Sequence, residues 1–323
     1  MRFEIITIFP GFFAGIFEHG IVRRAQAQGL VSVNMHDLRE FTHDRHRTVD
    51  DRPFGGGEGM VLKPEPLAEA LGSLGIVAKK KRVSVDQGAC SPTLAPEMRR
   101  KDGAPTSMEG SSAQDDSADV NATTSTRKID VRNSSTKVIL LSAQGRRFTQ
   151  TVARELAGLE RVVLICGRYE GVDERINQLY CDMELSIGDY VLSGGELAAA
   201  VVVDAVMRLV PGVLGNEASG EFESFGVADA EIAADEIGVP RSQHGAGGLL
   251  DYPHYTRPAE FGGVRAPEVL MNGDHLQIRR WRREQQLRKT LANRPDLLES
   301  AALSVEDRRL LASIRASGEK TAD

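Results

Sequence analysis

The sequence predicts an α/β protein in which a domain built on a largely parallel sheet is followed by a small all-helical domain. Short apolar runs rich in β-branched residues, typical of buried strands, alternate with helical patterns through most of the chain. Such alternation favours parallel strands joined by helices. Beyond Tyr252 only helical patterns remain, so a separate helical domain is expected there.

The first expected strand is the apolar run FEIITIF, which Pro10 and Gly11 close. The stretch 41–60 is polar and glycine-rich and has neither helical nor strand periodicity, so it should be a loop. The elements expected before residue 80 are a strand at 3–9, a helix at 12–28, a strand at 31–38, the loop at 41–60 and a helix at 66–74.

Residues 84–136 are rich in Ser, Thr, Ala, Asp and Gly, and cannot bury enough apolar surface to offset the entropy of ordering them. We therefore predict a disordered insertion there. The elements expected after it are strands at 138–142 and 162–167, a helix at about 149–158, a buried helix at 196–209, and helices near 274–291, 295–301 and 304–316. The predicted domains are 1–213, a flexible linker at 214–250, and 251–323.

Composition excludes several classes of protein. No run approaches the roughly 18 apolar residues that span a bilayer, and the N-terminus lacks a basic leader with a cleavage site, so we expect a cytoplasmic protein. Three cysteines without a C-x-x-C pair indicate reduced thiols rather than disulfides or structural zinc.

The formal net charge of −6 excludes a protein coated in basic residues. One segment is the exception. Residues 279–289, RRWRREQQLRK, hold six basic side chains and one acid around the only tryptophan, Trp281. The segment therefore carries a local charge of +5 within an acidic chain.

The segment CGRYEGVDER (166–175) follows the strand VVLIC directly. Gly167 and Gly171 would let backbone approach a ligand, at the carboxyl end of a strand, where α/β sheets place ligands. An ordinary strand-to-helix turn is the alternative interpretation.

In the segment SIGDYVLSGGE (186–196), a short strand is expected to end in Ser193-Gly194-Gly195 and to open a helix at Glu196. A glycine pair before a helix can bind an anion, but the acid that follows would repel phosphate, so a neutral or cationic ligand fits better. The motifs typical of dinucleotide and nucleoside triphosphate sites are missing from it.

The loop 41–60 places two histidines and three aspartates beside three arginines. His43, Asp44 and His46 could be read as metal ligands, but the nearby arginines would oppose a cation and suit phosphate and base contacts. A solvated loop without function is the third interpretation, although so long an ordered loop needs a reason.

Together these segments resemble the bacterial tRNA (guanine-N1)-methyltransferase family, of the SPOUT class of methyltransferases. The resemblance covers Met1 to about Ala312 and includes PGVLGNEAS (211–219), DYPHYTRP (251–258) and HLQIRRWR (275–282). It implies a trefoil-knotted, parallel-sheet domain, which periodicity alone does not predict.

The resemblance implies that loops LSAQG (141–145), CGRYEG (166–171) and SIGDYVLSGGE (186–196) bind S-adenosyl-L-methionine, the methyl donor. The cofactor-binding residues it implies are Leu141, Ser142, Gly167, Arg168, Tyr169, Glu170, Ile187, Gly188, Asp189, Tyr190, Val191, Leu192, Gly194 and Gly195. No metal ligand is assigned, and a role for Mg²⁺ is left open.

The family's product is N1-methylguanosine at position 37 of tRNA, immediately 3′ of the anticodon. Because guanine N1 carries a proton, the reaction needs a general base, with a cation near O6. By resemblance Arg208 is the cation. The base is an aspartate in the family, whose place Glu223 takes here, and Asp251 is the reserve candidate.

The resemblance also implies a homodimer, with tRNA bound between the knotted domain of one subunit and the helical domain of the other. The residues expected to contact tRNA are His46, Arg47, Asp50, Arg52, Gly59, Arg279 and Arg280. Neither DNA nor a membrane is expected as a partner. Two rival hypotheses stay open: a related SPOUT enzyme for another RNA, and an inactive RNA-binding module, which Glu223 and the long insertions make conceivable.

Overall fold

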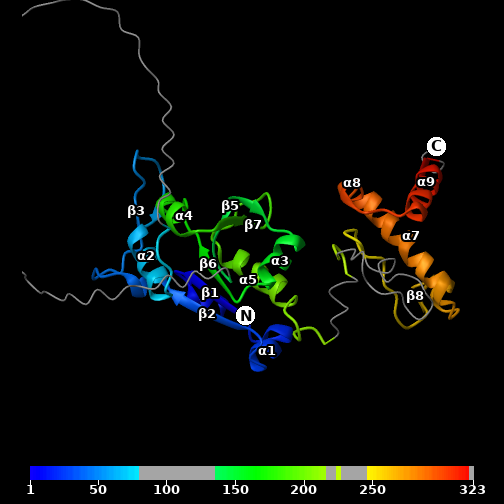
Figure 1. Cartoon of the computed structure of the whole chain (residues 1–323), viewed down its shortest axis with the longest axis horizontal. Helices are drawn as coiled ribbons and strands as arrows, with labels where there is room; N and C mark the ends of the chain where they lie inside the picture. Colours follow the sequence, from blue (N-terminus) through cyan, green and yellow to red (C-terminus); the bar gives the residue numbers. More distant parts are fainter. Residues whose placement is uncertain (80–134, 216–222, 227–245, 320–323) are drawn as a thin grey trace, which may run out of the picture.

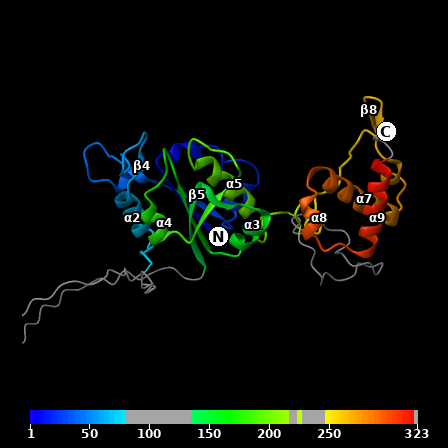
Figure 2. The same ribbon diagram turned by 90° about the horizontal axis from the view of Figure 1, so that it is seen from above.

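The computed structural model describes residues 1–79, 135–215, 223–226 and 246–319. Its centre is a five-stranded, all-parallel sheet in the order β2-β1-β6-β5-β7. Helices cover both faces of this sheet, as Figures 1 and 2 show, while α7, α8 and α9 stand apart from it. The predicted combination of a parallel α/β domain and a C-terminal helical region is confirmed.

The sheet strands are β1 (Arg2–Thr7), β2 (Ser32–Asp37), β5 (Thr136–Arg147), β6 (Arg161–Cys166) and β7 (Met183–Ser186). The helices packed on them are α1 (Gly20–Ala27), α2 (Pro64–Ser73), α3 (Gln150–Ala157), α4 (Glu174–Tyr180) and α5 (Glu196–Met207). Two 3₁₀ turns, η1 (Pro10–Phe13) and η2 (Leu38–Phe41), and a short hairpin, β3 (Asp50–Asp51) with β4 (Val61–Leu62), complete this part.

Burial explains why these strands form. Every residue of β6 is buried, because β6 lies in the middle of the sheet with helices on both faces. One face packs Phe3, Ile5 and Leu164 against α1, α3 and α5. The other face packs Ile6 and Ile165 against α2 and α4.

Strand β5 carries an irregularity that matters for the site. Its residues 139–141 pair with β7, the register then shifts, and Arg146 pairs with Leu185 again. The segment LSAQG spans this bulge. A Cβ on Gly145 would lie 2.5 Å from the carbonyl carbon of Glu184, so only glycine lets the two strands pass so closely.

The C-terminal region contains α7 (His275–Asn293), α8 (Asp296–Ser300) and α9 (Val305–Glu319), after a 3₁₀ turn, η4 (Glu268–Leu270). Its small core includes Leu249, Leu287 and Leu311. Arg283 on α7 donates to both carboxylate oxygens of Asp307 on α9, at 2.7 and 2.9 Å. This nearly buried pair joins the two long helices.

The structure corrects four details of the sequence prediction. Residues 14–19, expected to be helical, form turns between η1 and α1. The strand expected to end at Ser193 ends at Ser186, so 187–195 is loop. Thr136, assigned to the insertion, begins β5, which runs on to Arg147. The region expected to be all-helical also contains a hairpin of β8 (Glu260–Phe261) and β9 (Val264–Arg265).

Most of the predicted insertion and linker lies in 80–134, 216–222 and 227–245, outside the described residues. Within the described part of the chain, no helix has the length and apolar content needed to cross a membrane.

Candidate functional site

Two of the glycine-bearing segments meet at the carboxyl end of the sheet. Arg168 and Gly194 form an antiparallel bridge, and the Gly195 N–H donates to the Gly167 carbonyl at 2.9 Å. Leu141 pairs with Cys166 in the sheet, which brings the LSAQG bulge to the same edge. The three segments predicted to bind one ligand therefore lie together.

The glycines serve this close packing. A Cβ on Gly195 would lie 2.7 Å from the Cα of Cys166, and one on Gly194 would lie 2.1 Å from Nε of Arg168. Both distances are shorter than real side chains allow. The sequence interpretation gave glycine the role of admitting a ligand, whereas here these two glycines admit a neighbouring loop.

Arg168 holds the two segments together from inside. Its Nε donates to Oε2 of Glu196 at 3.1 Å, and Thr7 donates to the other oxygen, Oε1, at 2.8 Å. The guanidinium also lies 4.6 Å from the centre of the Phe9 ring. Arg168 compensates the charge of Glu196, and because Glu196 is only 1% exposed it is not presented to a ligand.

The outer surface of these loops is partly apolar. Tyr169, which adopts a left-handed backbone conformation with φ of 58°, is half exposed, as is Tyr190. Val191 is 87% exposed. Next to them, Asp189 pairs with Arg147, and the Ser186 hydroxyl both donates to the Gly188 carbonyl and accepts from its N–H. The exposed aromatic rings and the exposed Glu170 carboxylate suit a ligand that has a flat apolar group and a positive charge.

The end of the 41–60 loop is fixed to the same region. Glu170 N–H donates to the Met60 carbonyl at 3.0 Å, and Leu62 N–H donates to the Gly171 carbonyl at 3.0 Å. Gly59 lies against the Glu170 side chain, so closely that a Cβ would be 2.4 Å from Oε1. The loop therefore ends beside the site.

Of the other predicted tRNA-contacting residues of this loop, His46, Arg47 and Arg52 are exposed, whereas Asp50 is partly buried and pairs with Leu62 in the β3–β4 hairpin. Asp44 accepts hydrogen bonds from Thr48 within the loop, which lowers its pKa. His43 pairs with Glu69. Among the residues that the structure describes, no cluster of His, Cys, Asp and Glu could hold a metal ion, and the metal interpretation of His43, Asp44 and His46 gains no support.

The candidate catalytic pair lies at the far end of α5. Arg208 donates to both oxygens of Glu223, with NH1 to Oε1 at 3.0 Å and NH2 to Oε2 at 2.7 Å. The Arg208 and Glu223 side chains are 34% and 22% exposed. The structure thus brings together a cation and a carboxylate that are fifteen residues apart and that a substrate could reach.

Asp251, the reserve candidate, lies close to Glu223 in space. Its N–H donates to the Ser224 hydroxyl at 3.0 Å, so it is beside the segment that carries Glu223. Its carboxylate is engaged locally: Oδ1 accepts from the Tyr252 N–H at 2.8 Å, and Oδ2 lies 3.0 Å from Nε2 of His254.

The arginine side chains of the basic helix α7 differ in what they contact. Arg283 is occupied by Asp307 inside the helical region and cannot serve a partner. Arg280 is exposed, and Arg279 is half-buried and donates to the His275 carbonyl at 3.2 Å. Arg282 lies over the Tyr252 ring at 4.9 Å.

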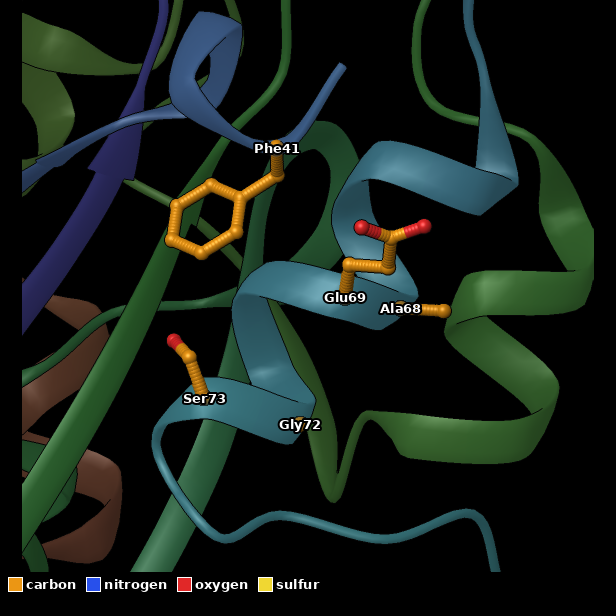
Figure 3. A pocket seen from close by; sticks show the side chains of 5 residues that line it. All are labelled: Phe41, Ala68, Glu69, Gly72 and Ser73. Carbon is orange, nitrogen blue, oxygen red and sulfur yellow. The ribbon is translucent and has the colours of Figure 1, made fainter. Parts of the chain in front are cut away.

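An open depression of about 480 Å³ lies between η2 and α2, and Figure 3 shows the side chains around it. Its lining residues are Phe41, Ala68, Glu69, Gly72 and Ser73. None of them belongs to the three glycine-bearing segments or to the Arg208–Glu223 pair. We therefore place the candidate site at those segments, where the polar groups converge.

Sequence reasoning missed several residues of the site. Thr7 and Phe9 contact the Arg168–Glu196 pair, and Gln150 contacts Glu223, with 3.4 Å between Nε2 and Oε1. Neither periodicity nor spacing marks such residues, because their role depends on contacts between distant segments.

The chain matches the family model described as tRNA (Guanine-1)-methyltransferase TrmD over residues 1–92 and 120–300. A protein of Koribacter versatilis named tRNA (guanine-N(1)-)-methyltransferase is 50% identical over 316 residues, which cover 98% of this chain and 99% of the relative. Proteins with the same name from Geobacter sulfurreducens and Dehalococcoides mccartyi are 41% and 42% identical, over 99% and 98% of this chain and 100% and 98% of the relatives. The chain belongs to the tRNA (guanine-1)-methyltransferase family, a family of methyl-transferring enzymes.

Proposed function

We propose that the protein transfers a methyl group from S-adenosyl-L-methionine to N1 of the guanine at position 37 of tRNA, immediately 3′ of the anticodon. The observation that carries this proposal is the Arg208–Glu223 pair. A carboxylate that can take a proton stands beside a guanidinium that can stabilise negative charge, in a chain whose relatives are named for methylating guanine N1 of tRNA.

The methyl-donor site is proposed at the three segments on the sheet edge. When bound, S-adenosylmethionine supplies an electrophilic methyl group. The exposed rings of Tyr169 and Tyr190 offer apolar surface for an adenine, and the Glu170 carboxylate suits a cationic ligand. Asp189, which pairs with Arg147, belongs to the same proposed site. Leu141, Ser142, Gly167, Ile187, Gly188, Val191, Leu192, Gly194 and Gly195 complete the proposed site. Arg168 acts from inside it, through Glu196.

At the acceptor base, Glu223 takes the proton of guanine N1 and leaves a nucleophilic lone pair on that nitrogen. Arg208 stabilises the charge that gathers on O6 as the proton leaves. In the resting pair both carboxylate oxygens accept from Arg208, so the guanidinium must release one of them when the base enters.

The proposed tRNA contacts come from both ends of the molecule. His46, Arg47, Asp50, Arg52 and Gly59 belong to the loop that ends beside Glu170, and Arg279 and Arg280 belong to α7. We propose the domains as 1–213 for the methyl donor, 214–250 as a linker and 251–323 for tRNA. Cytoplasmic localisation belongs to the same proposal, and a part for Mg²⁺ stays open.

A second copy of the chain is proposed to complete the site. Helix α5 begins at the donor segments and ends at Arg208, and its 12 residues extend about 18 Å at 1.5 Å per residue. Exposed apolar side chains lie on η1, on the residues that flank it and on the first two turns of α5: Phe9, Phe12, Ile16, Leu197 and Val201. A homodimer through this face would cover them and would bring one copy's base to the other copy's donor segments.

We also propose that the sheet is threaded as the trefoil knot of the SPOUT class. The close crossing of the 166–171 and 193–195 segments, where Gly195 meets Cys166, supports such a path.

The test uses the full chain, labelled S-adenosylmethionine and a tRNA transcript, followed by primer extension. N1 methylation blocks the Watson–Crick edge, so we expect label in the RNA and a stop at the guanosine 3′ of the anticodon. Replacing that guanosine with adenosine should abolish both signals. Label retained elsewhere would instead favour a related enzyme for another RNA. Saturable tRNA binding without transfer would favour the inactive RNA-binding module.

A further inference from the structure

The four residues 223–226 are held from two sides. On one side, Arg154 of α3 donates from NH2 to the Phe225 carbonyl at 2.9 Å, and Gln150 of α3 donates to Glu223 at 3.4 Å. On the other side, the Phe225 N–H donates to the Leu249 carbonyl at 2.8 Å. These contacts therefore hold the short segment, which carries the proposed base, in one position.

Helix α3 is a rigid support for the 223–226 segment. Gln150 and Arg154 are four residues apart and so share one face of the helix. Val152, Ala153 and Leu156 anchor α3 in the core and are fully buried. Thr149 caps the first turn by accepting from the Val152 N–H at 3.4 Å.

The segment needs such support. Phe225 has φ of 64°, a left-handed conformation that costs a non-glycine residue free energy and persists only where surrounding contacts impose it. Arg154 contacts the carbonyl of this same residue, so it recognises the backbone path rather than a particular side chain.

We propose that Gln150 and Arg154 are positioning residues, which seat the Glu223–Gly226 segment on α3 and thereby hold the Glu223 carboxylate beside Arg208. This inference rests on the proposed role of Glu223 as the base. Gln150 orients the carboxylate directly, and Arg154 fixes the turn that follows it.

Arg154→Ala and Arg154→Lys test the backbone contact, with Glu155→Ala as the matched control on the same helix. We expect Arg154→Ala to lower kcat roughly two- to tenfold, the size of one lost hydrogen bond, and to leave the dissociation constant of S-adenosylmethionine unchanged. The lysine variant should recover part of the loss, because an ammonium group can also donate to the carbonyl. Amide hydrogen exchange at Phe225 and Gly226 should speed up in Arg154→Ala and stay at the wild-type rate in Glu155→Ala.

Replacing Gln150 with glutamate should have opposite effects on kcat if Gln150 positions Glu223 and if it only stabilises the helix. A glutamate in the first turn stabilises a helix, so a stability role predicts that Gln150→Glu is harmless or favourable. Positioning predicts the opposite, since a second carboxylate would repel Glu223, and Gln150→Glu should lower kcat more than Gln150→Ala.

Unchanged exchange and unchanged kcat in Arg154→Ala would overturn the inference, and so would a Gln150→Glu variant as active as wild type. The exchange measurement needs no turnover. If the wild-type protein transferred no methyl group, the proposed function would fail while the seating of the segment on α3 could still be observed.

Discussion

The Glu223 carboxylate and the Arg208 guanidinium form a two-point ion pair, yet neither side chain is deeply buried. Ion pairs that remain accessible to water are worth only about 0–1 kcal/mol, because water screens them and competes for their hydrogen bonds. Opening the pair to admit a guanine would thus cost little. A fully buried pair in the same place would resist such opening.

We predict that Glu223→Gln lowers the rate of methyl transfer by about 10²–10⁴, the usual contribution of a general base. Glutamine keeps the size of the side chain and removes its ability to take a proton. Single-turnover transfer to tRNA, measured beside S-adenosylmethionine affinity, checks this. Glu223→Asp, which restores the residue expected from the family, is the control and should stay active. A glutamine variant with the wild-type rate would assign the base to Asp251.

The strands could be predicted because buried strands consist of apolar, β-branched residues. The apolar runs of β1, β5 and β6 can be recognised in the sequence without knowing which strands lie beside them. Residues 14–19 were wrongly expected to be helical, because the chain there turns and still buries both Phe13 and Phe17. The β8–β9 hairpin has only two residues per strand, too few for a periodic pattern.

The sequence predicted which segments form the candidate site, but it did not predict the contacts between their side chains. The sequence showed that glycine and charged residues gather in 166–175 and 186–196. It did not show that Glu196 accepts from Arg168 and Thr7, because these three residues lie in different elements. The same limit applies to Gln150 and Arg154, which contact a segment about seventy residues away.

Helices α7 and α9 depend on the Arg283–Asp307 pair, and this gives a pH prediction. Burial alone would raise the pKa of Asp307, but hydrogen bonds from Arg283 and the nearby positive charge outweigh it and lower the pKa below 3.8. A carboxylate with a lowered pKa in the folded state stabilises the fold above its unfolded pKa. That stability is lost as the pH falls through the folded pKa.

We therefore expect the helical region to lose stability when the pH drops below about 4. Asp307→Asn should remove about 3–5 kcal/mol at neutral pH, because it leaves Arg283 charged and unpaired in a nearly buried position. Thermal unfolding followed by circular dichroism at several pH values measures both effects. Asp296→Asn, which breaks an exposed pair with Arg294, is the matched control and should unfold like wild type. Equal melting of the two variants would contradict the assignment.

The proposed methyl-donor site and the proposed catalytic pair lie in different parts of the fold. The proposed donor segments and the Arg208–Glu223 pair lie at opposite ends of α5. Between them, the outer face of that helix exposes Leu197 and Val201 in its first two turns and Asp204 nearer to Arg208. A two-fold axis through such a face makes the same patch contact itself in both copies. One dimer would then contain two composite sites, each with donor segments from one copy and a base from the other.

Mixing two inactive variants tests this arrangement. Glu223→Gln removes the base, and Gly195→Ala disrupts the donor segments, because its Cβ would lie 2.7 Å from the Cα of Cys166 and 3.0 Å from the Gly167 nitrogen. Each variant, shown to be folded by circular dichroism, should be nearly inactive alone. After subunit exchange at equal concentrations, random pairing makes half of the dimers mixed. Each mixed dimer keeps one intact composite site, so activity should return to roughly a quarter of wild type. If base and donor segments of the same copy worked together, every site in the mixture would carry a defect, and no activity would return.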